Sequence, residues 1–195
     1  MLCFRWRGIE CRVSVLFPAL ITALLLYRDD TLTVTCLLAS LVHEGGHLLA
    51  MLLLRVPPKE CVLGLFGLRI RLVDHLRAYG KSIWVALAGP LANGLSAAIL
   101  LQFGCTESAW VHIFLATFNL LPVMALDGGE IVYCLLCAWG REDERLLRIT
   151  SFFIILTTMI GGAWLMWAHH NPTLWIVGAY LAAMAFFLDK NEKNT

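Results

Sequence analysis

Charged side chains are scarce in this sequence. Asp, Glu, Lys and Arg make up only 15% of its 195 residues, whereas 59% are hydrophobic, and the formal net charge is +1. An ordinary soluble domain has about 25% charged residues. The near-neutral balance gives no argument for a nucleic-acid partner, and the length leaves no room for a second sizeable domain. We therefore expect a single polytopic membrane domain over residues 1–195.

A disulfide framework is also lacking. The seven cysteines are odd in number and scattered along the chain, which is typical of small apolar side chains and not of a disulfide scaffold. Cys134 and Cys137 form a C-x-x-C pair, but no second pair and no redox-fold pattern accompanies them. We interpret both cysteines as structural residues.

The first apolar segment, Val13–Tyr27, is not followed by a small-residue cleavage site, and Arg28-Asp29-Asp30 comes directly after it. We therefore interpret it as a retained spanning helix and not as a secretory signal. Apolar runs and their breaks predict further spans, of which the fourth is a broken helix: Thr31–Leu54, Ser82–Phe103, Glu107–Trp139, Ile149–Ala168 and Thr173–Leu188. The predicted fold is an all-α membrane bundle of about six transmembrane helices.

Two segments outside these spans have strand periodicity. Met1–Arg12 alternates apolar and polar residues with a phase shift at Gly8, which predicts a short, bulged strand at the membrane surface. Leu63–Leu72, inside the segment Arg55–Lys81, predicts a β-hairpin or ribbon at the interface that could pair with the N-terminal strand. A plain basic loop fits this second segment about as well as a ribbon.

Basic residues are distributed unequally between the two sides of the predicted spans. Of the 15 Lys and Arg residues, Arg28 alone falls on one side and all others fall on the opposite side. The positive-inside rule therefore predicts that both termini are cytoplasmic.

The second predicted span contains His43-Glu44-Gly45-Gly46-His47. Residues four apart share one face of a helix, so both imidazoles can bind one ion with Glu44 beside them. In zinc hydrolases two imidazoles and one further ligand leave a position for water, whose proton a carboxylate accepts. An acidic residue within a spanning helix costs about 3 kcal/mol and therefore indicates function. The alternative is two core histidines on a buried helix.

A second acidic residue, Asp127, lies in apolar surroundings within the broken fourth span. The same insertion penalty requires a partner for it, so we expect Asp127 to be the third metal ligand. Gly128 and Gly129 would let the backbone approach closely and bend, so that the carboxylate points inward. The alternative is a turn in which Asp127-Gly128 is only a loop.

The third predicted span contains Pro90 and Asn93. Proline should kink this helix, and the backbone groups that it leaves without helical partners need protein or water around them. This part of the span should therefore face protein or water and not lipid.

Three motifs together resemble the site-2 protease family of intramembrane zinc metalloproteases, and within it the short branch of stage IV sporulation protein FB. They are the H-E-x-x-H of residues 43–47, the N-x-x-P-x-x-x-x-D-G-G of residues 119–129, and the G-P-x-x-N of residues 89–93. The resemblance covers nearly the whole chain. The first two motifs in combination are highly specific, whereas the third alone is weak.

The resemblance implies a role for each matched residue. One zinc ion would be bound by His43, His47 and Asp127, Glu44 would be the general base, and Asn119 would hold the substrate or its oxyanion. Candidates for contacts to the substrate or support of the ligands are Asn93, Gly128 and Gly129. The implied surroundings are a bacterial-type cell membrane, with a membrane-spanning or membrane-associated protein substrate, the lipid bilayer, and a regulatory membrane protein as a further candidate partner.

The sequence departs from the family pattern in two respects. Neither a PDZ nor a CBS domain is present in these 195 residues, so nucleotide control through a CBS module is not expected. Glu130 follows the D-G-G where many relatives have a basic or neutral residue. This leaves metal binding untouched but puts the local contacts of the fourth span in doubt.

Two functions compete. The leading hypothesis is an intramembrane zinc endopeptidase that cuts a membrane-associated or membrane-spanning protein. The alternative is a non-catalytic membrane protein that binds or transports a divalent metal. Glu44 discriminates between them, because a metal carrier needs the three ligands but not a neighbouring base. A structural scaffold, the third possibility, explains none of the buried acidic residues.

Overall fold

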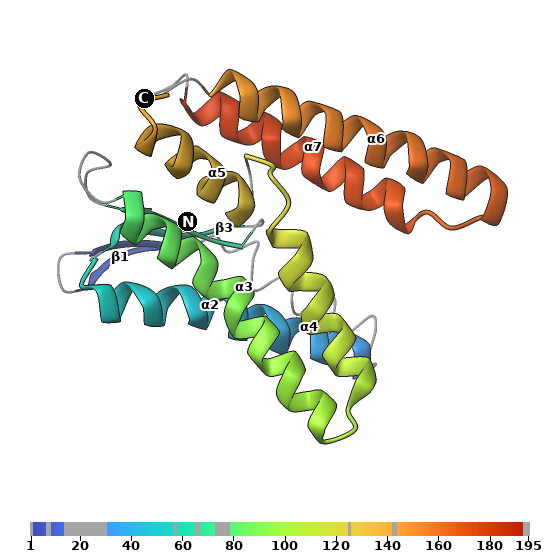
Figure 1. The fold of residues 1–195 in the computed structure, drawn as a ribbon, viewed down its shortest axis with the longest axis horizontal. Helices are drawn as coiled ribbons and strands as arrows, with labels where there is room; N and C mark the ends of the chain where they lie inside the picture. The colour runs from blue at the N-terminus through green and yellow to red at the C-terminus, as the bar shows by residue number, and fades with distance from the viewer. Residues whose placement is uncertain are drawn as a thin grey trace. The chain divides into compact units, whose positions relative to one another are not determined.

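The computed structural model describes residues 2–6, 9–13, 31–56, 58–64, 67–72, 79–124, 126–141 and 144–192. Within these ranges the helices are α2 (Thr31–Leu54), α3 (Tyr79–Gln102), α4 (Thr106–Asn119), α5 (Asp127–Ala138), α6 (Arg145–His169) and α7 (Thr173–Glu192) (Figure 1). The chain divides into two compact units, Met1–Asn119 and Leu120–Thr195. Beyond Val13, the first predicted span lies outside the described residues.

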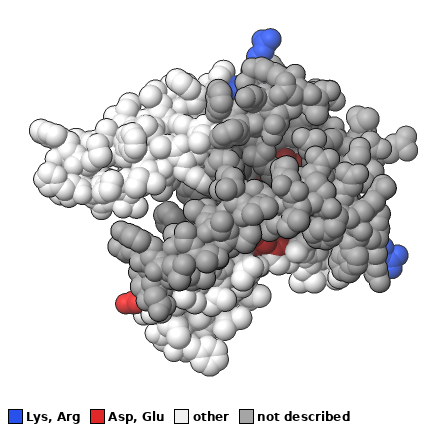
Figure 2. Space-filling view, turned by 180° about the vertical axis from the view of Figure 1, so that it is seen from behind, with Lys and Arg blue, Asp and Glu red and all other residues white. Residues whose placement is uncertain are grey.

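Three of these helices, α2, α3 and α6, are long and apolar enough to cross a membrane. Their outward faces carry large apolar side chains such as Leu52, which is 75% exposed. Charged side chains are few among the described atoms of the face in Figure 2. Exposed apolar surface of this extent needs a cover, and lipid provides it. The prediction of a membrane protein is confirmed, whereas the count of six spans stays a prediction.

Small residues allow the helices of the first unit to pack closely. Helix α3 packs against both α2 and α4, and α2 also contacts α4. A Cβ added at Gly46 of α2 would come within 2.5 Å of the Ala88 carbonyl oxygen of α3. Small side chains at helix crossings permit this approach in membrane proteins, where van der Waals packing replaces the hydrophobic drive.

The third helix continues through its proline. Pro90 lies inside α3 and is buried, as are Gly89 and Asn93. A proline removes one helical hydrogen bond, and the carbonyl that loses its donor must avoid lipid. The expectation that this turn faces protein is confirmed.

The strands of the first unit are β1 (Leu2–Trp6), β2 (Ile9–Val13), β3 (Pro58–Gly64) and β4 (Gly67–Leu72), and they form one sheet in this order. Strands β1 and β2 pair antiparallel, β2 and β3 parallel, and β3 and β4 antiparallel. The ribbon and not the plain loop is therefore found in the segment Leu63–Leu72, within β3 and β4. Strand β3 also pairs with β2 of the N-terminal segment.

The expectation of a single bulged strand over Met1–Arg12 is wrong, because Trp6 pairs with Ile9 and the chain forms two antiparallel strands there. In the sequence, the two residues between these strands are Arg7 and Gly8. A two-residue connection containing glycine is a hairpin signal. The shift in alternation thus falls between two strands and not within one bulged strand.

In the second unit, the break predicted around Pro122 is confirmed, since α5 begins only at Asp127. The non-helical backbone before α5 has its own partners. Leu126 N–H donates to the Val123 carbonyl at 2.9 Å, and Met124 N–H donates to Ser151 Oγ of α6 at 3.0 Å. Such partners are required because unpaired backbone groups are costly in apolar surroundings.

Helices α6 and α7 form a hairpin within the second unit (Figure 1). The turn predicted near Pro172 is confirmed, and His170 ends α6 in the left-handed conformation with a φ of 53°. A Cβ at Gly162 of α6 would come within 2.5 Å of the Trp175 backbone nitrogen of α7. The two backbones therefore meet closely at this glycine.

Candidate metal centre

The two histidines of α2 come together as their spacing predicts. His43 and His47 are 6% and 8% exposed, and their Nε2 atoms are 3.2 Å apart. The rings are arranged edge to face, with centroids 4.8 Å apart. Two imidazole nitrogens thus converge on one point inside the protein.

The outer nitrogen of each ring is held by α3. Nδ1 of His47 lies 2.7 Å from the Val85 carbonyl oxygen, and Nδ1 of His43 lies 3.2 Å from Asn93 Nδ2. A carbonyl can only accept, so His47 carries its proton on Nδ1 and offers a lone pair at Nε2. Histidines that bind metals are usually oriented in this way by a partner of the other nitrogen.

Gly89 of α3 lies directly against both imidazoles. A Cβ at this position would run into Nε2 of His47 and would come within 2.9 Å of Cε1 of His43. Any side chain here would displace the rings. The G-P-x-x-N motif, weak as a sequence signal, therefore provides both the space for the imidazoles and a polar partner for one of them.

Asn93 is fully buried, and its amide also reaches a residue that the sequence analysis did not single out. Its Oδ1 lies 3.1 Å from Nδ1 of His112 on α4. In the sequence, the one signal for His112 is its position two turns before Asn119, on the same helix face. No other possible metal ligand lies three or four residues from His112. The sequence pattern therefore does not reveal it.

The other predicted residues of the first unit are less constrained. Glu44 is half-buried and follows His43 on α2. Asn119, also half-buried, donates from Nδ2 to the Leu115 carbonyl of its own helix at 2.9 Å. The expected contact of Asn119 with substrate stays a prediction.

Asp127 is the first residue of α5 in the second unit. The helix dipole favours a carboxylate at this end. Gly128 and Gly129 are buried, and a Cβ on either would collide with backbone, of Leu120 for Gly128 and of Val123 for Gly129. The close backbone approach expected of these glycines is confirmed.

Among the described residues, His43, His47 and Asp127 form a group of donors that could hold one metal ion. Two imidazoles and one carboxylate are a donor set that catalytic zinc sites use, with a fourth position left for water or substrate. The residue types and the contact of His47 Nδ1 with the Val85 carbonyl therefore suit a zinc ion.

Comparisons with known proteins found three matches for this chain. The family model described as Peptidase family M50 matches residues 105–161. Stage IV sporulation protein FB of Bacillus subtilis (strain 168) is 27% identical over 200 residues, which cover 93% of this chain and 67% of that protein. The Site-2 Protease from Methanocaldococcus jannaschii matches with a TM-score of 0.68 and 19% identity, over 94% of this chain and 93% of that chain. These three matches support the site-2 protease family for this chain.

The family inferred from the three sequence motifs is thus confirmed. The matches also support a metalloprotease in a membrane. Residues 105–161 also include Asn119 and Asp127, so the match covers the second of the two specific motifs. The solved structure supports the fold.

Proposed function

We propose that the protein is an intramembrane zinc endopeptidase that cleaves a membrane-spanning or membrane-associated protein. The observation that supports it best is the convergence of two buried Nε2 atoms at 3.2 Å, with the outer nitrogen of each ring held by α3. A hydrogen bond between two core histidines also brings their Nε2 atoms to this distance. The carboxylate of Asp127 in the same group of donors favours a shared metal ion.

In this proposal each residue has a defined role. His43, His47 and Asp127 hold the ion, which when bound makes water acidic and polarises the peptide carbonyl. Glu44 accepts the proton of the attacking water and returns it to the leaving amine. Asn119 turns its amide from the Leu115 carbonyl toward the substrate and donates to the developing oxyanion.

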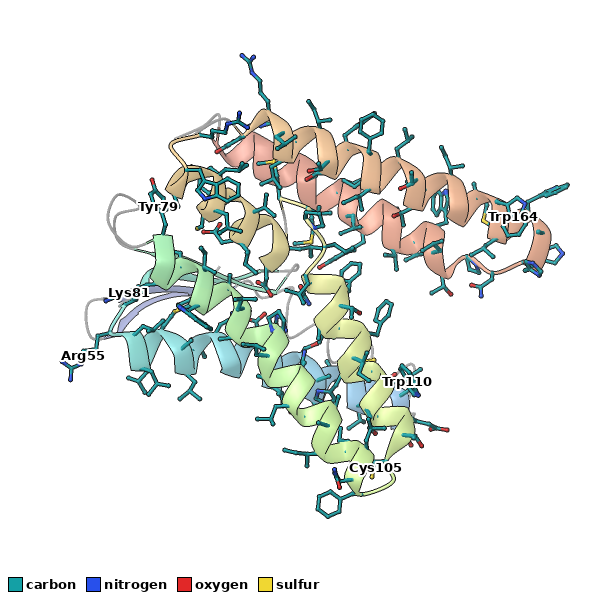
Figure 3. All side chains as sticks on the ribbon, viewed as in Figure 1. Arg55, Tyr79, Lys81, Cys105, Trp110 and Trp164 are labelled. Atoms are coloured by element: carbon teal, nitrogen blue, oxygen red, sulfur yellow. The ribbon has the colours of Figure 1, made fainter. Side chains whose placement is uncertain are left out.

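The proposed orientation in the membrane places both termini in the cytoplasm. Figure 3 shows Arg55, Tyr79 and Lys81 at one end of the α2–α3 pair and Cys105 at the other, and Lys81 Nζ donates to the Leu54 carbonyl at 3.2 Å. The basic ends of both helices therefore coincide, as the positive-inside rule requires. His47 then lies about 10 Å from the cytoplasmic end of α2.

Cysteine labelling tests this orientation on a background without the native cysteines. Labels at positions 75 and 192 should react only after the cytoplasmic face has been opened. Ready labelling of both positions from outside would contradict the proposed topology.

Substrate entry is proposed to use strand β4. Among the described strands β4 pairs only with β3, so its other edge can accept an extended segment. A spanning substrate must be partly unwound before its peptide bond is accessible, and pairing with an edge strand holds the extended form. Substrate would add to the sheet beside Leu68–Leu72.

Proline scanning of β4 tests this entry route. Backbone N–H groups alternate between the two edges of a strand, so Ile70→Pro and Arg71→Pro remove donors toward opposite edges. The proline that acts on the open edge should impair cleavage and leave zinc content unchanged. Full activity in both variants would argue against a role for β4.

The central test is Glu44→Gln, in which size and hydrogen-bonding reach are kept but the base is lost. We expect zinc content to hold and cleavage to fall by about 10²–10⁴-fold. Glu130→Gln is the matched control, because Glu130 is exposed on α5 and, among the described residues, accepts a weak contact from Cys134 Sγ at 3.5 Å. Asp127→Asn should instead lower zinc affinity and activity together.

Metal analysis and a cleavage assay on the same preparations distinguish the two competing functions. Cleavage by Glu44→Gln at a near wild-type rate would refute the protease mechanism. The binding or transport of a divalent metal would then be the better account of the three ligands.

A further inference from the structure

A continuous line of polar groups crosses the three packed helices of the first unit. It runs from His112 of α4 through Asn93 of α3 to His43 and His47 of α2, and ends at the Val85 carbonyl of α3. Successive polar atoms along it are 3.1, 3.2, 3.2 and 2.7 Å apart. All four side chains are buried. Each hydrogen bond in such a line constrains the direction of the next.

The donor and acceptor roles along this line are set at the Val85 end and are adjustable at Asn93. The Val85 carbonyl requires a proton on Nδ1 of His47, which leaves Nε2 of His47 as an acceptor or ligand. Nδ1 of His43, by contrast, faces an amide, and an amide offers a donor at one atom and an acceptor at the other.

The orientation of the Asn93 amide decides whether His43 can bind a metal. With Nδ2 toward His43, as the structure has it, Nδ1 of His43 accepts and the ring proton is on Nε2. A protonated Nε2 has no lone pair for an ion. Ligation through Nε2 therefore requires the proton on Nδ1, facing Oδ1 of Asn93.

A half-turn of the amide exchanges its two polar atoms without a change of shape, and the two settings are nearly indistinguishable by shape alone. After this turn, Nδ2 of Asn93 faces His112 and donates to its Nδ1, so His112 carries its proton on Nε2. Each of the two rings keeps one proton throughout. Only the tautomers of His43 and His112 change.

We propose that His112 is a positioning residue that sets the Asn93 amide and, through it, the tautomer in which His43 binds metal. By accepting at Nδ1, His112 holds the amide nitrogen on its own side and leaves the amide oxygen for His43. The inference rests on the proposed metal site and extends it to a residue two contacts away from the ligand His43.

The first test measures zinc affinity by chelator competition on the full chain, in the Glu44→Gln background so that cleavage plays no part. His112→Phe removes the acceptor and should weaken zinc binding by about 10–100-fold, as the loss of such supporting partners does. Trp110→Phe is the control, because Trp110 lies on the exposed face of α4, and should leave the affinity unchanged. Equal affinity in the wild type and His112→Phe would overturn the inference.

A second background separates positioning from packing. In Asn93→Asp a carboxylate accepts from both sides, so His43 keeps its Nδ1 proton whatever His112 does. His112→Phe should then cost far less zinc affinity than it does beside Asn93, which is the non-additivity expected of coupled residues. An equal loss in both backgrounds would show that His112 only fills space, and the inference would be wrong.

The tautomer itself is observable by ¹⁵N NMR of histidine-labelled, zinc-loaded protein. We expect the proton of His112 on Nε2 and that of His43 on Nδ1, and a proton on Nδ1 of His112 would overturn the inference. Failure of the parent protein to bind zinc would instead refute the proposed function. Zinc binding that is insensitive to His112 refutes only the present inference.

Discussion

The buried amide and imidazoles of the first unit find their partners differently from the threonines of α6 in the second unit. In α6 the hydroxyl groups of Thr150, Thr157 and Thr158 all donate to carbonyls of their own helix. Asn93 instead pairs with residues on two other helices, His43 and His112. A hydroxyl satisfied by its own helix makes no demand on neighbours, whereas a partner on another helix constrains the packing of both.

The helices of the two units also differ in burial. Of the apolar 18-residue stretch of each helix, 33% is buried in α3 and 11% in α6. Helix α6 is therefore mainly outward-facing. Phe152 and Trp164 of α6 are more than half exposed. Chemistry that requires exclusion of water is therefore expected where polar groups are buried between helices, and the imidazoles of the first unit meet that condition.

Of the substitutions that test this difference between the units, Gly89→Ala in the first unit should have the largest effect. The added Cβ would collide with the His47 ring, so the two imidazoles could no longer converge. We expect zinc affinity to fall by about 10-fold or more. Gly94→Ala, where an added Cβ meets nothing within 4 Å, is the matched control on the same helix. Normal zinc binding by Gly89→Ala would contradict the described packing.

A smaller effect, of another kind, is expected from Gly162→Ala in the hairpin. The new Cβ would press on the Trp175 backbone and should destabilise the protein by about 1–3 kcal/mol, the usual cost of overpacking. Thermal unfolding in detergent measures the stability, and chelator competition on the folded protein should show unchanged zinc affinity. A selective loss of zinc would mean that the hairpin supports the site directly, and the contrast between the units would fail.

The smallest effect is expected from Thr157→Val. Thr157 is exposed, and among the described residues its hydroxyl donates to two backbone carbonyls of α6, those of Phe153 and Ile154. Unfolding free energy should change by no more than about 0.5 kcal/mol, with cleavage and zinc content unaltered. Loss of activity would assign the exposed face of α6 a functional contact.

Apolar runs and breakers predicted most of the helices because both signals are local. Residues 31–54 form one helix with the predicted bounds, and Pro122 marks a true break before Asp127. The predicted start of this span, Ile149, lies after the observed start of α6, because the charged residues before it break the apolar run. The helix begins at Arg145, and Arg148 pairs with Glu144 one turn away at 3.1 Å, which accommodates charge at the helix end.

The sequence by itself determined that two imidazoles share one helix face as a candidate metal-binding pair, because the spacing of His43 and His47 is a property of one helix and needs no other element. The tertiary structure alone decided what holds these rings. The rings contact the Val85 carbonyl and Gly89 of α3, and the hydrogen bonds continue through Asn93 to His112 of α4. These helices are separated by other segments of the chain. No local periodicity encodes such contacts, because they depend on which faces of α2, α3 and α4 pack together.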